Sequence, residues 1–187
     1  MTSNEIVFRV IEELERHGVP YMLVGSYSSN AFGIARSTQD ADFVIEAGDR
    51  SLAPVFQALS PIIKFDPQMQ LESVTMTLRF IGQVPVTGFK IELFLTSNDP
   101  HDQERFRRRK RYPFLTGHAF LPSPEDVLLQ KMRWYVRAKR AKDLDDVQNV
   151  LAVQAGKLDL PYIRQWADRH GTRELFERLL TAVQGLQ

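Results

Sequence analysis

Hydrophobic residues recur with a helical period at both ends of the chain and form shorter, strand-like runs in between. Residues 4–17 carry an apolar stripe at helical spacing that stops before Gly18, which predicts an amphipathic helix. Residues 124–153 read as helix after Ser123, a good N-cap, but about thirty residues is long for one globular helix. We therefore expect a break near 139–142. Two further helices are predicted over 160–171 and 173–186.

Short apolar runs between these helices predict β-strands. Residues 20–25 and 41–47 read as buried strands. Residues 73–82 and 88–96 are rich in β-prone side chains and are separated by turn-forming residues, which predicts an antiparallel pair. A last short strand is predicted over 117–122 and a helix over 50–59.

The order of these elements predicts the fold class. Strands alternate with helices first, and the last third is helical, which is typical of an α/β (α+β) protein. A chain of 187 residues fits one domain, or one domain with a helical appendage. We expect a core over 1–122 and a helical C-terminal region over 123–187 packed on it.

Composition removes several classes of protein. Hydrophobic residues make up 43% and charged residues 25%, so a packed core is expected rather than disorder. The net charge of +1 gives no global attraction for nucleic acid. The absence of cysteine removes disulfides and thiolate chemistry, and it suits a cytoplasmic location. The N-terminal pattern contains acids and does not resemble a signal peptide. No apolar run approaches the ~20 residues that a membrane-spanning helix needs, so we expect no association with a membrane.

Acidic side chains stand at the entrance of one predicted strand and inside another. Asp40 and Asp42 are alternate residues, so they point to one face with backbone positions ~6.5 to 7 Å apart. Two carboxylates this close repel unless a cation joins them, and Mg²⁺, with Mn²⁺ as the alternative, suits oxygen ligands. Glu92 reaches the same site if its strand lies beside the first. The other interpretation is a pair of solvated turn acids.

The dipeptide Gly25-Ser26 ends the first strand. Such a turn lets backbone N–H groups approach phosphate oxygens, and the Ser hydroxyl can donate to one of them. Residues 26–33 are long enough for one or two helical turns, with Ser26 as the predicted N-cap. Together with three carboxylates on neighbouring strands, this turn favours a two-metal phosphoryl-transfer centre over solvated surface acids.

These residues resemble a known family. Gly25-Ser26, then thirteen residues, then Asp40-Ala41-Asp42 resembles the signature of the DNA polymerase β-like nucleotidyltransferase superfamily. The segment over 121–151 resembles the helical part of its minimal members, which include AbiEii-type toxins of toxin–antitoxin pairs. The likeness covers roughly residues 20–152. The other matching positions are Gly33, Arg36 and Thr38.

The resemblance implies a small mixed β-sheet flanked by helices, Mg²⁺ dependence, and transfer of NMP from an NTP. It also implies an RNA acceptor such as a tRNA end, and a cognate antitoxin protein as partner. By position it assigns metal ligation to Asp40 and Asp42. It assigns nucleotide binding to Gly25, Ser26, Lys131 and Asp143, and more weakly to Asp146. The third carboxylate of the family is often Asp, and here it is Glu92.

Several residues keep two interpretations. The basic cluster over 104–111 either holds an RNA backbone or a triphosphate, or forms a solvated surface. Arg36 either braces the Gly25-Ser26 turn or touches phosphate, and Thr38 orders the loop through its hydroxyl. Trp134 and Trp166 are predicted to anchor helix packing, and structural roles are predicted for His118 and His170.

The function itself keeps two alternatives. In one, the fold is retained without chemistry, as a binding or regulatory module. In the other, the acceptor is a hydroxyl of a protein or of a small molecule such as an aminoglycoside.

Overall fold

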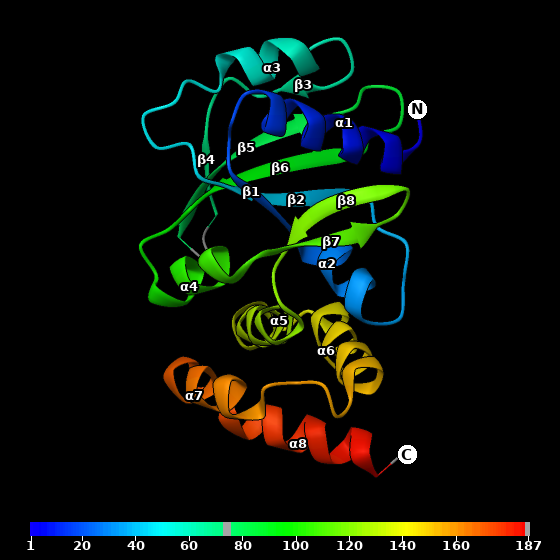
Figure 1. The fold of residues 1–187 in the computed structure, drawn as a ribbon, viewed down its shortest axis with the longest axis vertical. Helices are drawn as coiled ribbons and strands as arrows, with labels where there is room; N and C mark the ends of the chain where they lie inside the picture. Colours follow the sequence, from blue (N-terminus) through cyan, green and yellow to red (C-terminus); the bar gives the residue numbers. More distant parts are fainter. Residues whose placement is uncertain (73–75, 186–187) are drawn as a thin grey trace.

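The computed structural model describes residues 1–72 and 76–185, and its centre is a mixed β-sheet (Figure 1). Two strands pair in parallel at the middle of the sheet, and the other described pairs in it are antiparallel. The parallel strands are β2 (Asp40–Ile45) and β6 (Lys90–Leu95). The others are β1 (Tyr21–Val24) beside β2, β5 (Thr77–Gln83) beside β6, and β3 (Lys64–Phe65) and β4 (Gln70–Glu72) beyond β5. The predicted α/β class and the antiparallel pair are confirmed.

The two faces of this sheet differ in chemistry. Leu23, Phe43 and Leu93 point to the first face and are fully buried in the main hydrophobic core. The helices over that face are α1 (Ser3–Arg16) and α3 (Ala53–Leu59) (Figure 1). Side chains alternate along a strand, so Asp42 and Glu92 point to the second face. They are direct partners in the parallel register, which confirms that the two strands lie side by side.

Helices occupy the end of the molecule away from α1 and α3 (Figure 1). They are α5 (Pro124–Ala138), α6 (Ala141–Gln154), α7 (Leu160–His170) and α8 (Arg173–Gln184). Lys139 ends α5 with a left-handed φ of 53°, so the predicted break is confirmed. Between these helices and the sheet lie α2 (Gly25–Phe32), α4 (Pro100–Arg108) and the hairpin of β7 (Lys110–Phe114) and β8 (Gly117–Leu121). Among the described helices, none is long and apolar enough to cross a membrane.

The highly charged segment over 98–113 is more ordered than its composition indicated. It contains α4 and β7, neither of which was predicted. The Asp99 side chain caps α4 by accepting from the amides of His101 and Asp102, and a proline follows at the first helical position. This start signal was present in the sequence, but the run of charges obscured it.

Two element starts also differ from the prediction. α2 begins at Gly25, directly after β1, so Ser26 lies inside the helix and the prediction that it is the N-cap is wrong. The strand predicted to begin at residue 73 begins at Thr77, and residues 73–75 lie outside the described residues. The short strands β3 and β4 were not predicted, because two or three residues are too few for a periodic pattern.

A pair of histidines joins α4 to α7, with His101 buried and His170 half-buried. The ring centroids of His101 and His170 lie 4.8 Å apart, and Trp166 packs against both rings. Burial lowers the pKa of both histidines, to about 3 for His170. Arg133 adds to the lowering at His170, and Asp99 opposes it. The predicted structural role of His170 is therefore confirmed.

We expect His170→Phe to reduce the acid sensitivity of the fold. A histidine that stays neutral when folded but gains a proton when unfolded costs stability as the pH falls below ~6.5. Between pH 7.5 and 5, wild type should lose about 1 to 2 kcal/mol more unfolding free energy than the variant, measured by urea denaturation. His118→Phe removes an exposed histidine and should behave as wild type. An equal loss of unfolding free energy between pH 7.5 and 5 in His170→Phe and wild type would contradict this prediction.

Candidate active site

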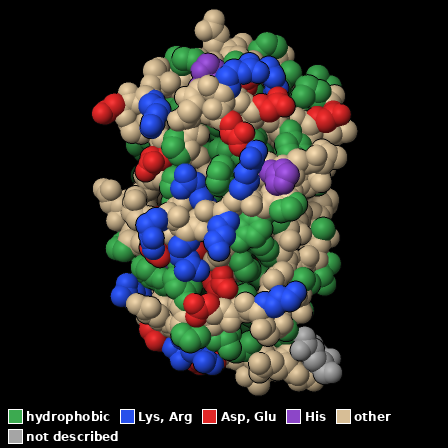
Figure 2. Space-filling view, in the orientation of Figure 1, with side chains coloured by type: hydrophobic (Ala, Val, Ile, Leu, Met, Phe, Trp, Pro, Cys, Tyr) green, Lys and Arg blue, Asp and Glu red, His purple; other side chains and the backbone are tan. Residues whose placement is uncertain are grey.

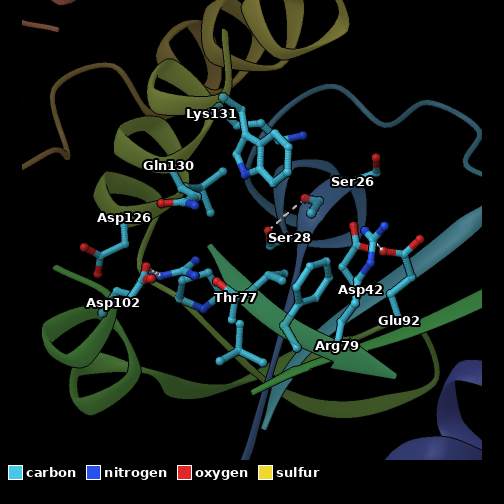
Figure 3. A pocket seen from close by; sticks show the side chains of 18 of the residues that line it. Ser26, Ser28, Asp42, Thr77, Arg79, Glu92, Asp102, Asp126, Gln130 and Lys131 are labelled. Carbon is cyan, nitrogen blue, oxygen red and sulfur yellow. Dashed lines mark hydrogen bonds and ion pairs between the residues drawn. The ribbon is translucent and has the colours of Figure 1, made fainter. Parts of the chain in front are cut away.

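A pocket of about 180 Å³ lies between the second face of the sheet and α5 (Figure 3). Figure 3 shows Asp42 and Glu92 at one end of it, and Asp102 and Asp126 at the other. The floor between these ends includes Val24, Val44 and Phe94. The α5 wall consists of Val127, Gln130, Lys131 and Trp134, whose i, i+3, i+4, i+7 spacing places them on one helical face.

The predicted carboxylates meet at one end of this pocket. Asp40, Asp42 and Glu92 all line it, as the strand geometry predicted. Burial, together with the charges of Asp40 and Glu92, raises the pKa of Asp42 to about 7. Lys131 and Lys142 act in the opposite direction. The acids therefore repel one another, and a bound cation would relieve that repulsion.

Glu92 already has a cationic partner in this structure. Arg79 of β5 places Nη1 2.7 Å from Glu92 Oε2. Burial raises the pKa of Glu92, Arg79 opposes this effect, and Asp40 adds to it. Within residues 1–72 and 76–185, no three His, Asp or Glu side chains are grouped so that they could hold a metal ion as they stand. Glu92 is therefore held by Arg79, whereas neither Asp40 nor Asp42 has a Lys or Arg ion-pair partner among the described residues.

The start of α2 lies directly against Asp42. Gly25 has a φ of 63°, and a Cβ atom at this position would collide with Asp42 Oδ2. Glycine tolerates the positive φ, and because it has no Cβ atom it also allows the close approach of the Asp42 carboxylate. The N-cap residue Val24 makes no side-chain hydrogen bond to the first turn of α2. Backbone N–H groups of that turn can therefore serve an anion beside the carboxylates.

We expect Gly25→Ala to cost about 1 to 3 kcal/mol of unfolding free energy and to abolish any activity that depends on Asp42. The new methyl group must displace either α2 or the Asp42 carboxylate. Gly156→Ala is the matched control, because Gly156 also has a positive φ, of 77°, but has no atom within 4 Å of the added Cβ. Thermal unfolding of both variants separates the cost of the collision from that of the backbone conformation. Equal losses in the two variants would argue against the close approach.

Residues on the loop between α2 and β2 hold Ser26 and Asp40 in place at the Asp42 end of the pocket. Arg36 Nη2 donates to Ser26 Oγ at 3.0 Å, so Arg36 braces the turn, as one of its two interpretations required. The Thr38 hydroxyl donates to Asp40 Oδ1 at 2.7 Å and orients that carboxylate, which extends its predicted ordering role. Ser26 lines the pocket, whereas Arg36 and Thr38 are not among its lining residues and act through the residues that they hold.

Lys131 and the two helical aspartates form a buried network. Lys131 Nζ lies 2.6 Å from Asp146 Oδ2 and 3.3 Å from Asp143 Oδ1. Asp146 also receives Arg36 Nε at 2.8 Å and the Ser29 hydroxyl at 3.1 Å. Burial by itself would raise the pKa of Asp146, but these hydrogen bonds and charges outweigh it and lower the pKa. Lys131 reaches the pocket, while Asp143 and Asp146 support it from behind.

The two tryptophans have different environments. Trp166 is 8% exposed and belongs to the main core, which confirms its predicted packing role. Trp134 is only partly buried and lines the pocket, so the prediction that it anchors helix packing is wrong. Its position three residues after Lys131 was the available signal, because the two share a helical face.

The basic cluster over 104–111 is largely engaged within the protein. Arg105 pairs with Asp102, and Arg107 pairs with Glu104. Arg108 lies 3.4 Å from a carboxylate oxygen of α5 and stacks on a tyrosine ring, and Arg109 lies over two phenylalanine rings. Figure 2 shows acidic side chains among the basic ones on this face. These contacts favour the interpretation of the cluster as surface structure.

Solved structures that are similar to this chain share one fold. No family model matches the sequence, and no curated protein matches it. A structure of ANT(2")-Ia in complex with adenylyl-2"-tobramycin has a TM-score of 0.63 at 7% identity, covering 92% of this chain and 99% of that one. An antigenic nucleotidyltransferase-like protein from Paracoccidioides brasiliensis has a TM-score of 0.58 at 17% identity, covering 97% and 94%. Lincomycin-bound LnuA, a lincosamide antibiotic adenylyltransferase, has a TM-score of 0.54 at 14% identity, covering 82% and 98%. The chain therefore has the nucleotidyltransferase fold.

Proposed function

We propose that this chain is a nucleotidyltransferase, which transfers NMP from an NTP to a hydroxyl group. The observation that supports this most strongly is the position of Asp42. Its carboxylate lies against the N-terminal end of α2 and beside Glu92, within one pocket. Carboxylates next to an anion-binding helix end are the parts that phosphoryl transfer needs.

In the proposed reaction, the acceptor oxygen forms a bond to the α-phosphorus of the NTP. The bond from that phosphorus to the bridging oxygen of the β-phosphate breaks, and pyrophosphate leaves. The first-turn N–H groups of α2 hold the triphosphate. Ser26 accepts from Arg36, so its own hydroxyl proton remains available for a phosphate oxygen. Lys131 adds positive charge at the pocket wall.

The acids have separate roles in this proposal. Mg²⁺, with Mn²⁺ as the alternative, fits Asp40 and Asp42, because magnesium is commonly held by one or two carboxylates plus substrate phosphates. When bound, the metal supplies charge neutralisation at the phosphates. Within the described residues, neither aspartate has a Lys or Arg ion-pair partner that would compete. Glu92 serves as a third ligand, or accepts the hydroxyl proton, once Arg79 has turned toward a phosphate.

The acceptor has two candidates. A tRNA end, with a role as the toxin partner of an antitoxin, rests on the family resemblance alone, since the arginines of 104–111 largely have partners within the chain. A small-molecule hydroxyl is favoured by the extension of the pocket beyond the carboxylates, as far as Asp102 and Asp126. It is also favoured by the structural neighbours that hold adenylyl-2"-tobramycin and lincomycin.

Incubation with each α-³²P-labelled NTP and Mg²⁺ tests the function. Total tRNA, an aminoglycoside and a lincosamide are supplied as separate acceptors, and both label transfer and pyrophosphate release are followed. We expect one acceptor to become labelled, with one pyrophosphate released for each transfer. NTP binding without pyrophosphate release on any acceptor would support the inactive binding module instead.

A further inference from the structure

Trp134 is placed unlike a helix-packing residue. It lines the pocket on the same face of α5 as Lys131, one turn further along the helix. Its neighbour Tyr135 packs against the main core, but Trp134 does not belong to either hydrophobic cluster of the described residues. A large aromatic ring that borders a pocket without core packing is available to a ligand.

The indole ring is supported from one side by a fixed cation. The guanidinium carbon of Arg140 lies 4.5 Å from the Trp134 ring centroid. Arg140 Nε donates to Asp143 Oδ2 at 2.7 Å, and Asp143 is fully buried and also contacts Lys131. The guanidinium therefore occupies one face of the ring, and a planar group would stack on the other face.

The charges of the pocket indicate which ligand belongs beside Trp134. Lys131, Arg140 and Lys142 all line this part of the pocket. The far end carries Asp102 and Asp126, and each of these aspartates already has an arginine partner, Arg105 and Arg108 respectively. An anionic nucleotide fits the basic and aromatic part better than the far end, where the arginines are engaged by aspartates, and this leaves the far end to the acceptor.

We propose that Trp134 is the stacking platform for the base of the NTP, with Arg140 as its backing. This inference rests on the proposed nucleotidyl transfer, because it gives the base of the same substrate a position. Stacking tolerates different bases, so Trp134 sets the affinity for the nucleoside part more than the choice among bases.

The chain contains two tryptophans, so single-tryptophan variants isolate the signal. In Trp166→Phe, only Trp134 emits, and we expect its fluorescence to be quenched as Mg²⁺ and each of the four NTPs are added. Inorganic tripolyphosphate should compete with the NTP without quenching. Trp134→Phe is the matched control, in which only the core residue Trp166 emits, and its fluorescence should stay unchanged.

Substitution gives a second readout. Trp134→Ala should raise the Kd and KM for the NTP about five- to 150-fold, which is the range for losing one base–aromatic stack, and leave tripolyphosphate affinity unchanged. Trp134→Phe should restore most of the NTP affinity, because it keeps an aromatic face.

The outcomes separate this inference from the proposed function. Nucleotidyl transfer by Trp166→Phe without any change in Trp134 emission would overturn the stacking inference and leave the function standing. Emission that responds to the acceptor but not to the NTP would also overturn it. Quenching by NTPs in a chain that transfers to no acceptor would support the stacking inference and remove the proposed activity.

Discussion

Asp42→Ala is expected to abolish nucleotidyl transfer, with a loss on the order of 10³-fold or more, while the chain remains folded. Asp42 lies at the meeting point of β2, β6 and the start of α2, which is where the proposed reaction would develop charge on the transferring group. Groups that stabilise this charge typically contribute several orders of magnitude in rate. Transfer is measured with labelled NTP and the acceptor identified for wild type. A variant that transfers at the wild-type rate would refute the site assignment.

The same substitution should leave the thermal midpoint of the metal-free protein unchanged or slightly higher. Burial, together with Asp40 and Glu92, raises the pKa of Asp42 to about 7, so its ionised form is unfavourable in the folded state. An acid with a raised folded pKa costs stability above that pKa and costs nothing below its unfolded pKa. The gain from Asp42→Ala should therefore be larger at pH 8 than at pH 5. Asp49→Ala, at an exposed acid, should show no such dependence on pH.

The convergence of the carboxylates could be predicted because it depends on local rules. Strand alternation places Asp40 and Asp42 on one face whatever the tertiary structure. Placing Glu92 at the same site required one further assumption, that its strand lies beside the strand of Asp40 and Asp42. The parallel pairing of β2 with β6 confirms that assumption. The amphipathic helices and the break after α5 followed from periodicity and length in the same way.

The parts that could not be predicted depend on contacts between distant segments. The pairing of Arg79 with Glu92 requires the register of β5 on β6, which no local pattern specifies. Trp134 carried a misleading signal, since a tryptophan on an amphipathic helix is usually buried. The network around Asp146 joins three segments, and helical spacing alone indicated only that Asp143 and Asp146 share a face.

Asp146→Ala is expected to cost about 3 kcal/mol of unfolding free energy, the largest loss among the single substitutions considered. The Asp146 carboxylate is 2% exposed and is shared by the side chains of Arg36, Lys131 and Ser29. Removing it leaves two cations with one fewer partner in a buried region. Asp143 still contacts Lys131, and Arg36 is 30% exposed, so the loss should lie at the low end of the range for broken buried pairs.

Asp145→Ala is the matched control, because Asp145 is the exposed neighbour on the same helix and should change stability by less than about 0.5 kcal/mol. Urea denaturation compares the two variants. Asp146→Asn, which keeps the shape but loses the charge, should fall between Asp146→Ala and wild type. In the folded fraction of Asp146→Ala, the KM for the NTP should rise more than kcat falls, because Arg36 no longer fixes Ser26 at the triphosphate turn. Stability equal to that of Asp145→Ala would show that the network does not hold α2, α5 and α6 together.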